Sequence, residues 1–78
     1  MSVTVLYFAS LRDAAGRAEE TLPRPDDLPS LYESLRVRHG LPFPATSLRV
    51  AVDGAFRGWN HPVADGAEIA FIPPVSGG

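Results

Sequence analysis

The sequence predicts an α+β domain in which a mixed sheet of about five strands carries one main helix across one face. Short runs rich in β-branched and aromatic residues occur in several places and are too short for helices of that composition. A single segment repeats its apolar residues at helical spacing. The length of 78 residues leaves room for one small hydrophobic core. We therefore expect one domain, without an internal repeat or a linker.

The chain opens with a predicted strand hairpin. Residues 3–10, VTVLYFAS, are dense in β-branched and aromatic side chains, which is typical of a strand. Residues 11–16, LRDAAG, contain Gly16 as a turn residue, and residues 17–22 favour a weak returning strand. This interpretation places the main helix further along the chain.

One amphipathic helix follows the hairpin. Asp26 and Asp27 offer side-chain oxygens to the free N–H groups of a helix start, and Gly40 stands where a left-handed residue would end the helix. The spacing predicts a helix of about three turns with one face toward the sheet. The residues on that face are Leu28, Leu31, Tyr32, Leu35 and His39.

The second half of the chain contains three further predicted strands. Residues 48–53 alternate apolar and other side chains, as a half-buried strand does. Asp53 and Gly54 form a hairpin signal, after which residues 55–60 are expected to return as a short strand. Residues 67–74 favour a last strand that ends at its prolines, because proline has no N–H to donate to a sheet.

This order of strand, strand, helix, strand, short strand and strand matches a β-grasp, the ubiquitin-like architecture. We expect residues 1–74 to form the β-grasp domain. Residues 75–78 are expected to form a flexible C-terminal tail that ends in Gly-Gly.

Alternation of side chains divides the predicted sheet into an inner and an outer face. We assign the set that contains Val3, Val5 and Tyr7 to the inner face, beneath the helix. The opposite set is unexpectedly apolar, and contiguous apolar patches usually mark interfaces. A register error of one residue, or a covering loop, would remove this patch. Its members are Leu6, Phe8, Ala51, Ala70 and Ile72, with Phe56 from the hairpin.

Composition disfavours several classes of function. Seven basic and nine acidic residues give a formal charge of −2 without a broad basic stripe, so we expect no nucleic-acid binding. The short basic cluster of Arg36, Arg38 and His39 is interpreted as a solvated helix face. A Walker-type glycine-rich loop is missing, so the chain is not expected to bind ATP itself. His39 and His61 are isolated, and no metal site is predicted.

The sequence also favours one cellular compartment. It has no cysteine, which removes disulfides and thiolate chemistry and suits a reducing environment. The apolar stretch near the N-terminus ends at Ser10, far short of the roughly 20 residues that span a bilayer. We expect a cytoplasmic protein that does not bind membranes.

The last residues, IPPVSGG, suggest a reactive terminus. Pro73 and Pro74 favour a stiff, extended exit from the last strand. Glycine has no Cβ, so a tail that ends in Gly77 and Gly78 can pass through a narrow channel. Such a tail can present its terminal carboxylate to the active site of another protein.

Three segments resemble one known family. VLYFASLRDAAG near the start, LRVAVDG in the middle and above all IPPVSGG at the end are similar to the small subunit of molybdopterin synthase, the MoaD-type sulfur carriers. The resemblance covers essentially the whole chain. Two positions depart from the family pattern: Asp53 stands where the family often has Asn, and Ala67 replaces an Asp. Both lie away from the tail.

The resemblance implies that Gly78 is the working group of a β-grasp protein. In this family a ubiquitin-activating-like (MoeB-type) adenylyltransferase uses ATP to adenylate the terminal carboxylate, and a sulfur donor converts it to a thiocarboxylate. The tail enters the large (MoaE-type) subunit in a heterotetramer, where its sulfur attacks a cyclic pyranopterin precursor and builds the dithiolene of molybdopterin. This chain alone is not expected to be catalytic or to bind a cofactor.

The resemblance also implies roles for particular residues. Tail insertion is assigned to Val75, Ser76 and Gly77, and partner binding to Phe8, Phe56, Ile72, Pro73 and Pro74. The parity of the strands independently places Phe8 and Ile72 on the outer face.

Three alternatives stay open. A ThiS-like carrier would deliver sulfur for the thiazole of thiamine from the same kind of terminus. A ubiquitin-like modifier would join Gly78 to lysines of target proteins. A plain β-grasp interaction module would have an ordinary frayed terminus.

Overall fold

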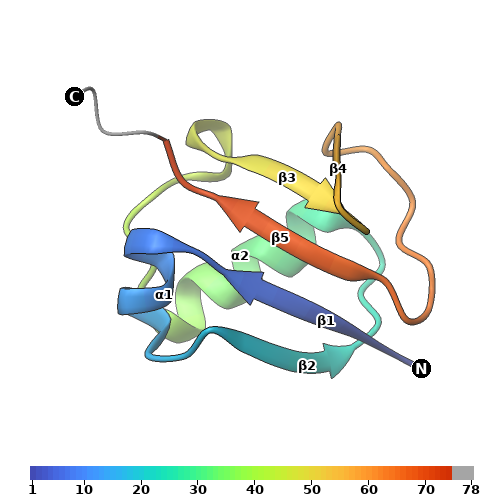
Figure 1. The fold of residues 1–78 in the computed structure, drawn as a ribbon, viewed down its shortest axis with the longest axis horizontal. Coiled ribbons are helices and arrows are strands. Elements are labelled where there is room, and N and C mark those ends of the chain that lie inside the picture. Colours follow the sequence, from blue (N-terminus) through green and yellow to red (C-terminus); the bar gives the residue numbers. More distant parts are fainter. Residues whose placement is uncertain (75–78) are drawn as a thin grey trace.

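The computed structural model describes residues 1–74, and its five strands form one mixed sheet with helix α2 across one face (Figure 1). The sheet order is β2-β1-β5-β3-β4; β1 and β5 run parallel, and the other neighbours are antiparallel. The predicted β-grasp class is confirmed. The elements are β1 (Ser2–Tyr7), α1 (Ala9–Ala15), β2 (Glu19–Pro23), α2 (Leu28–His39), the 3₁₀ turn η1 (Ala45–Ser47), β3 (Arg49–Val52), β4 (Ala55–Arg57) and β5 (Glu68–Ile72).

The inner face of the sheet forms the core with α2. Val5 pairs with Ile69 across the central parallel strands, and Tyr7 pairs with Phe71; Val5, Ile69 and Phe71 are fully buried. Phe71 also lies opposite Val50 of β3. The predicted division into faces is therefore confirmed for β1, β3 and β5.

The predicted connection between the first two strands is wrong. β1 ends at Tyr7, and the segment interpreted as a turn is helix α1. The returning strand predicted over residues 17–22 is present as β2, with its bounds shifted to Glu19–Pro23. Leu11 is fully buried and fixes this helix to the core, while Gly16 ends it with a left-handed φ of 74°, a conformation that costs glycine little. The antiparallel pairing of the two strands was predicted correctly.

Helix α2 has the start and end that the sequence predicted. Asp27 is the N-cap, and its carboxylate accepts a hydrogen bond from the backbone N–H of Ser30 at 2.8 Å. Hydrogen bonds from Ser30 lower the pKa of the Asp27 carboxyl below its usual range. Gly40 closes the helix in the left-handed region. Neither helix in residues 1–74 is long and apolar enough to cross a bilayer.

The β3–β4 hairpin forms at the predicted Asp-Gly turn. Asp53 and Gly54 both have positive φ, 51° and 86°, as two-residue hairpin turns of this kind require. The Asp53 carboxylate accepts the backbone N–H of Glu68 at 2.9 Å and so ties the turn to β5. β4 is shorter than predicted and spans Ala55–Arg57.

Candidate functional site

An apolar groove lies where β5 ends and the chain leaves the sheet. It is lined by the end of β5, the start of α1 and the loop after α2. Four residues assigned to partner binding by resemblance, Phe8, Ile72, Pro73 and Pro74, meet in this groove. Its further lining residues are Ala9, Ser10 and Phe43. None of these side chains carries a titratable group, so the groove is suited to binding rather than to acid–base chemistry.

The start of α1 presents Phe8 to solvent. Phe8 is the extended N-cap residue of α1, makes no side-chain capping hydrogen bond, and is 46% exposed. Ala9 follows with φ of 51°, which costs a residue with a Cβ roughly 1–2 kcal/mol. Strained backbone of this kind concentrates at functional sites. The buried side chain of Leu11 holds the helix in place against this cost.

Tyr32 of α2 fixes the opposite wall of the groove. Its hydroxyl donates a hydrogen bond to the backbone carbonyl of Phe43 at 2.6 Å. Burial raises the pKa of the Tyr32 phenol, so the phenol stays protonated and keeps donating at neutral pH. Phe43 was not among the predicted site residues, because its place follows from this long-range contact and not from a local pattern.

The outer face of the sheet is also apolar. The strand register aligns Leu6, Ala70, Ala51 and Phe56 in one row across four strands. Ala51 and Ala70 are only 9% exposed although they lie outside the core cluster, because an alanine methyl group scarcely rises above the sheet. The predicted patch is therefore a shallow central floor, with Leu6 half-buried at one end and Phe56 exposed at the other.

Phe56 lies apart from the groove, and its ring contacts a cationic side chain. The Arg49 guanidinium lies 4.1 Å from the centre of the Phe56 ring, within the range of a cation–π interaction. Arg49 is opposite Ile72 in the sheet register and so connects Phe56 to the groove. It was not predicted as a site residue, although its alternation with Val50 places it on the outer face.

A polar cluster lies at the opposite edge of the sheet, around Glu20. One Glu20 carboxylate oxygen accepts the Tyr7 hydroxyl at 2.7 Å and lies 2.9 Å from His39 Nε2. The other oxygen lies 3.2 Å from an Arg38 nitrogen and 3.6 Å from an Arg17 nitrogen. The cluster joins β1, β2 and the last turn of α2, so His39 and Arg38 are not simply the solvated face that the sequence suggested.

This cluster changes the pKa of its members. Burial favours the neutral form of Glu20, but hydrogen bonds from Tyr7 and His39 outweigh burial and hold the Glu20 pKa below its usual range. Burial, together with the hydrogen bond to Glu20, raises the pKa of Tyr7. The pair is therefore a phenol donating to a carboxylate.

The predicted site residues fall into three groups. Phe8, Ile72, Pro73 and Pro74 lie together, Phe56 lies on β4, and residues 75–78 lie outside the described residues, so their predicted roles stay predictions. Within residues 1–74, no three His, Cys, Asp or Glu residues are grouped as metal ligands would be.

Comparison with known proteins identifies relatives that cover nearly the whole chain. The ThiS family matches residues 5–78. The molybdopterin synthase sulfur carrier subunit of Escherichia coli is 34% identical over 83 aligned positions, covering 97% of this chain and 99% of that protein.

Two solved structures share the fold at full or nearly full length. The small archaeal modifier protein 1 of Methanosarcina acetivorans has a TM-score of 0.81 and 26% identity, covering 99% of this chain and 96% of that one. A chain of the protein–protein complex of subunits 1 and 2 of the molybdopterin-converting factor from Helicobacter pylori has a TM-score of 0.70 and 26% identity, with both chains fully covered. On the extent of the family match and of the Escherichia coli relative, the chain belongs to the ThiS family of sulfur carriers, within which it resembles the molybdopterin synthase small subunit.

Proposed function

We propose that this protein is the sulfur-carrier small subunit of a molybdopterin synthase, and that the Gly78 carboxylate is the group that carries the sulfur. The observation that carries the proposal is the 34% identity to the Escherichia coli sulfur carrier subunit over 97% of the chain. The family match, which extends to residue 78, supports the role of the terminus.

The chemistry follows from the poor reactivity of a carboxylate. A carboxylate oxygen of Gly78 attacks the α-phosphorus of ATP in the active site of an adenylyltransferase, and pyrophosphate leaves. A donor at the oxidation level of sulfide then attacks the carbonyl carbon of the acyl adenylate, and AMP leaves, because a phosphate ester is a far better leaving group than oxide. The product is a thiocarboxylate whose sulfur is nucleophilic toward a cyclic pyranopterin precursor.

The apolar surfaces support the second requirement of a sulfur carrier, which is docking on its partner proteins. A carrier must dock on the activating enzyme and on the large synthase subunit and direct its tail into each active site. The groove of Phe8, Ile72, Pro73 and Pro74 lies at the base of that tail, and the solved complex of two converting-factor subunits contains a relative of this chain. We propose this groove and the outer face, with Phe56, as the docking surface for both partners.

Intact-mass spectrometry tests the proposal directly. The protein is purified from cells that also make an activating enzyme, and a variant lacking Gly78 is the control. We expect a mass gain equal to the exchange of one oxygen for one sulfur in the full chain and no gain in the control. An unchanged mass, with an activating enzyme that is competent on a known carrier, would contradict the proposal.

A ubiquitin-like modifier is the second candidate, because the small archaeal modifier protein 1 shares the fold at 26% identity. Covalent conjugates of a tagged chain, visible on a blot and lost on deletion of Gly77 and Gly78, would support it. A thiocarboxylate that restores molybdopterin formation with a large subunit, but not thiazole formation, would separate the first proposal from a ThiS-like role.

A further inference from the structure

β2 forms a free edge of the sheet, on the side away from β4 (Figure 1). The backbone N–H of Tyr7 donates to the carbonyl of Ala18, and the N–H of Arg24 donates to the carbonyl of Met1. Hydrogen-bonded pairs alternate along an antiparallel ladder, so Glu20 and Leu22 also direct their backbone groups toward β1. The residues between them direct theirs outward. Glu19 and Thr21 thus offer an N–H and a C=O each, and Pro23 offers a C=O. Within residues 1–74 no strand pairs with this edge.

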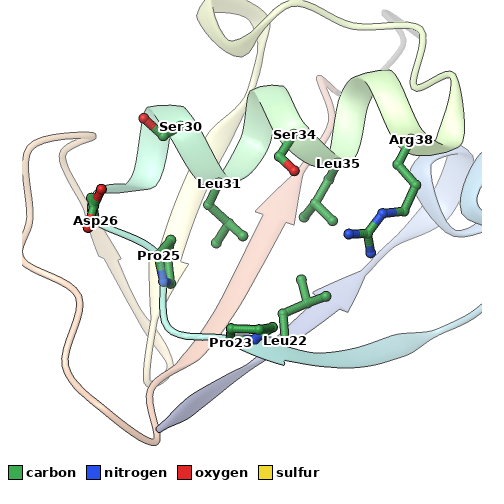
Figure 2. A pocket seen from close by; sticks show the side chains of 9 residues that line it. All are labelled: Leu22, Pro23, Pro25, Asp26, Ser30, Leu31, Ser34, Leu35 and Arg38. Atoms are coloured by element: carbon green, nitrogen blue, oxygen red, sulfur yellow. The ribbon is translucent and has the colours of Figure 1, made fainter.

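An apolar groove runs between this edge and α2. Leu31 and Leu35 point from α2 toward the sheet, and Leu22 points toward them from β2 (Figure 2). Pro25 lies near one end of the groove. The volume of about 320 Å³ is at the low end for small-molecule pockets. Because it adjoins unpaired strand backbone, the groove is better suited to the alternate side chains of an added strand.

The two ends of the groove differ in charge. Arg38 lies at one end and Asp26 at the other (Figure 2). Arg38 and Arg17 share the single carboxylate of Glu20, and their side chains are 52% and 54% exposed. The neighbouring Glu19 pairs with Leu6 and therefore has its side chain on the outer face of the sheet. The Arg38 end is left with an excess of positive charge.

We propose that the β2 edge and this groove bind an extended peptide segment of a partner protein. The segment adds to β2 as a strand, inserts aliphatic side chains at alternate positions between Leu22 and α2, and places acidic residues against Arg38 and Arg17. The groove shares no residue with the one beside Pro73 and Pro74. A partner can therefore bind here while the tail is engaged elsewhere, and the interaction goes beyond sulfur transfer.

The test is an NMR titration of the isotope-labelled full chain with a short synthetic peptide that has a run of valine and isoleucine followed by aspartates. We expect the backbone amide shifts to change mainly in residues 19–22 and 30–38. A peptide with lysines in place of the aspartates should bind about tenfold more weakly, because it meets Arg38 with like charge.

Two matched pairs of variants separate the backbone from the charge. Thr21→Pro removes one outward N–H, whereas Thr21→Val keeps it; proline is tolerated at such edge positions. Arg38→Glu reverses the charge in the groove, whereas Arg36→Glu makes the same change on a residue that pairs with Glu33 instead. Thr21→Pro and Arg38→Glu should each weaken binding about tenfold, and their partners should not. Arg38→Gln replaces Arg38→Glu if thermal melting shows that the reversal unfolds the domain.

The proposal is overturned if the acidic peptide binds more weakly than about 1 mM, or if its shifts fall on the outer face. An affinity for the acidic peptide that is unchanged by Thr21→Pro in a folded protein also overturns it. Amide shifts of residues 19–22 that depend on protein concentration without peptide would instead assign the edge to self-association. Deletion of Gly77 and Gly78 should leave peptide binding unchanged, so failure of the sulfur-carrier role and failure of this one are distinguishable.

Discussion

Both faces of the sheet carry apolar residues, but those on the inner face form the core, whereas the outer face includes exposed side chains. On the inner face Phe71 is fully buried, packs at 5.0 Å between ring centres against Tyr32, and stacks on Trp59. On the outer face Phe56 is 56% exposed and contacts the Arg49 guanidinium. The strands alternate in the same way on both sides, so hydrophobic pattern alone does not distinguish a core from an interface. What distinguishes them is whether another element of the chain covers the face.

Replacing one phenylalanine on each face sharpens this contrast. Phe71→Ala should lower the free energy of unfolding by about 3–5 kcal/mol, because it leaves a cavity in the core. Phe56→Ala removes the same atoms but should cost less than about 1 kcal/mol, since much of that ring already contacts water and its cation–π interaction is exposed. Urea denaturation followed by circular dichroism measures both. Equal losses would mean that Phe56 belongs to the core.

Phe8→Asp tests the binding role of the groove beside Pro73 and Pro74 without disturbing the fold. Phe8 is the N-cap of α1 and makes no side-chain cap, and aspartate is a favoured N-cap residue. Stability should therefore be kept. Affinity for a large molybdopterin synthase subunit should fall about 10- to 100-fold, since burial of a phenylalanine contributes roughly 1.5–3 kcal/mol.

Titration calorimetry with the large subunit measures this loss, and Val37→Asp is the control. Val37 is 70% exposed on α2 and lines neither the groove beside Pro73 and Pro74 nor the outer face. The same apolar-to-acid change there should therefore leave the affinity unaltered. An unchanged affinity in folded Phe8→Asp would remove Phe8 from the docking surface.

Glu20→Gln examines the polar cluster around Glu20 and has a smaller expected effect than Phe71→Ala or Phe8→Asp. The amide cannot replace a carboxylate that faces Tyr7, His39 and two arginines, so we expect a loss of about 1–2 kcal/mol at pH 7. The folded-state pKa of Glu20 lies below its usual value. Its stabilising contribution is therefore present above the unfolded pKa of about 4.3 and is lost as the pH falls through the folded pKa.

The difference in stability between the two proteins should accordingly shrink below about pH 4. Comparison of the two proteins is needed because Asp27 and Glu33 also have lowered pKa values and lose stabilisation in the same range in both. Thermal melting across the acid range measures the difference. A constant difference down to the acid end would show that the Glu20 charge does not contribute.

Much of the fold could be predicted from local pattern. Helix α2 was found from its spacing and from the caps at Asp27 and Gly40, and the turn at Asp53 from its dipeptide. Helix α1 was missed because seven residues give too little periodicity to distinguish a short helix from a turn. Its only buried residue, Leu11, leaves no repeating stripe to recognise.

The candidate site was found only in part for a related reason. Phe8 and Ile72 follow from strand parity, and the resemblance to known carriers supplied Phe56 and the two prolines. Phe43 joins the groove only because Tyr32 hydrogen-bonds its carbonyl, and Glu20 meets His39 only because β2 lies beside the end of α2. These contacts span 11 and 19 positions in the chain.

The division between local and long-range information has a physical basis. Alternation and helical spacing are properties of neighbouring residues, so the amino-acid order alone already divides the side chains of each strand between two faces and sets the glycine-rich terminus apart. The sheet order, with β1 and β5 at its centre, arises from pairing between distant segments. That pairing is selected by how well the assembled core buries apolar surface, and so only the folded structure decided which exposed side chains share a groove and which strand was left with a free edge.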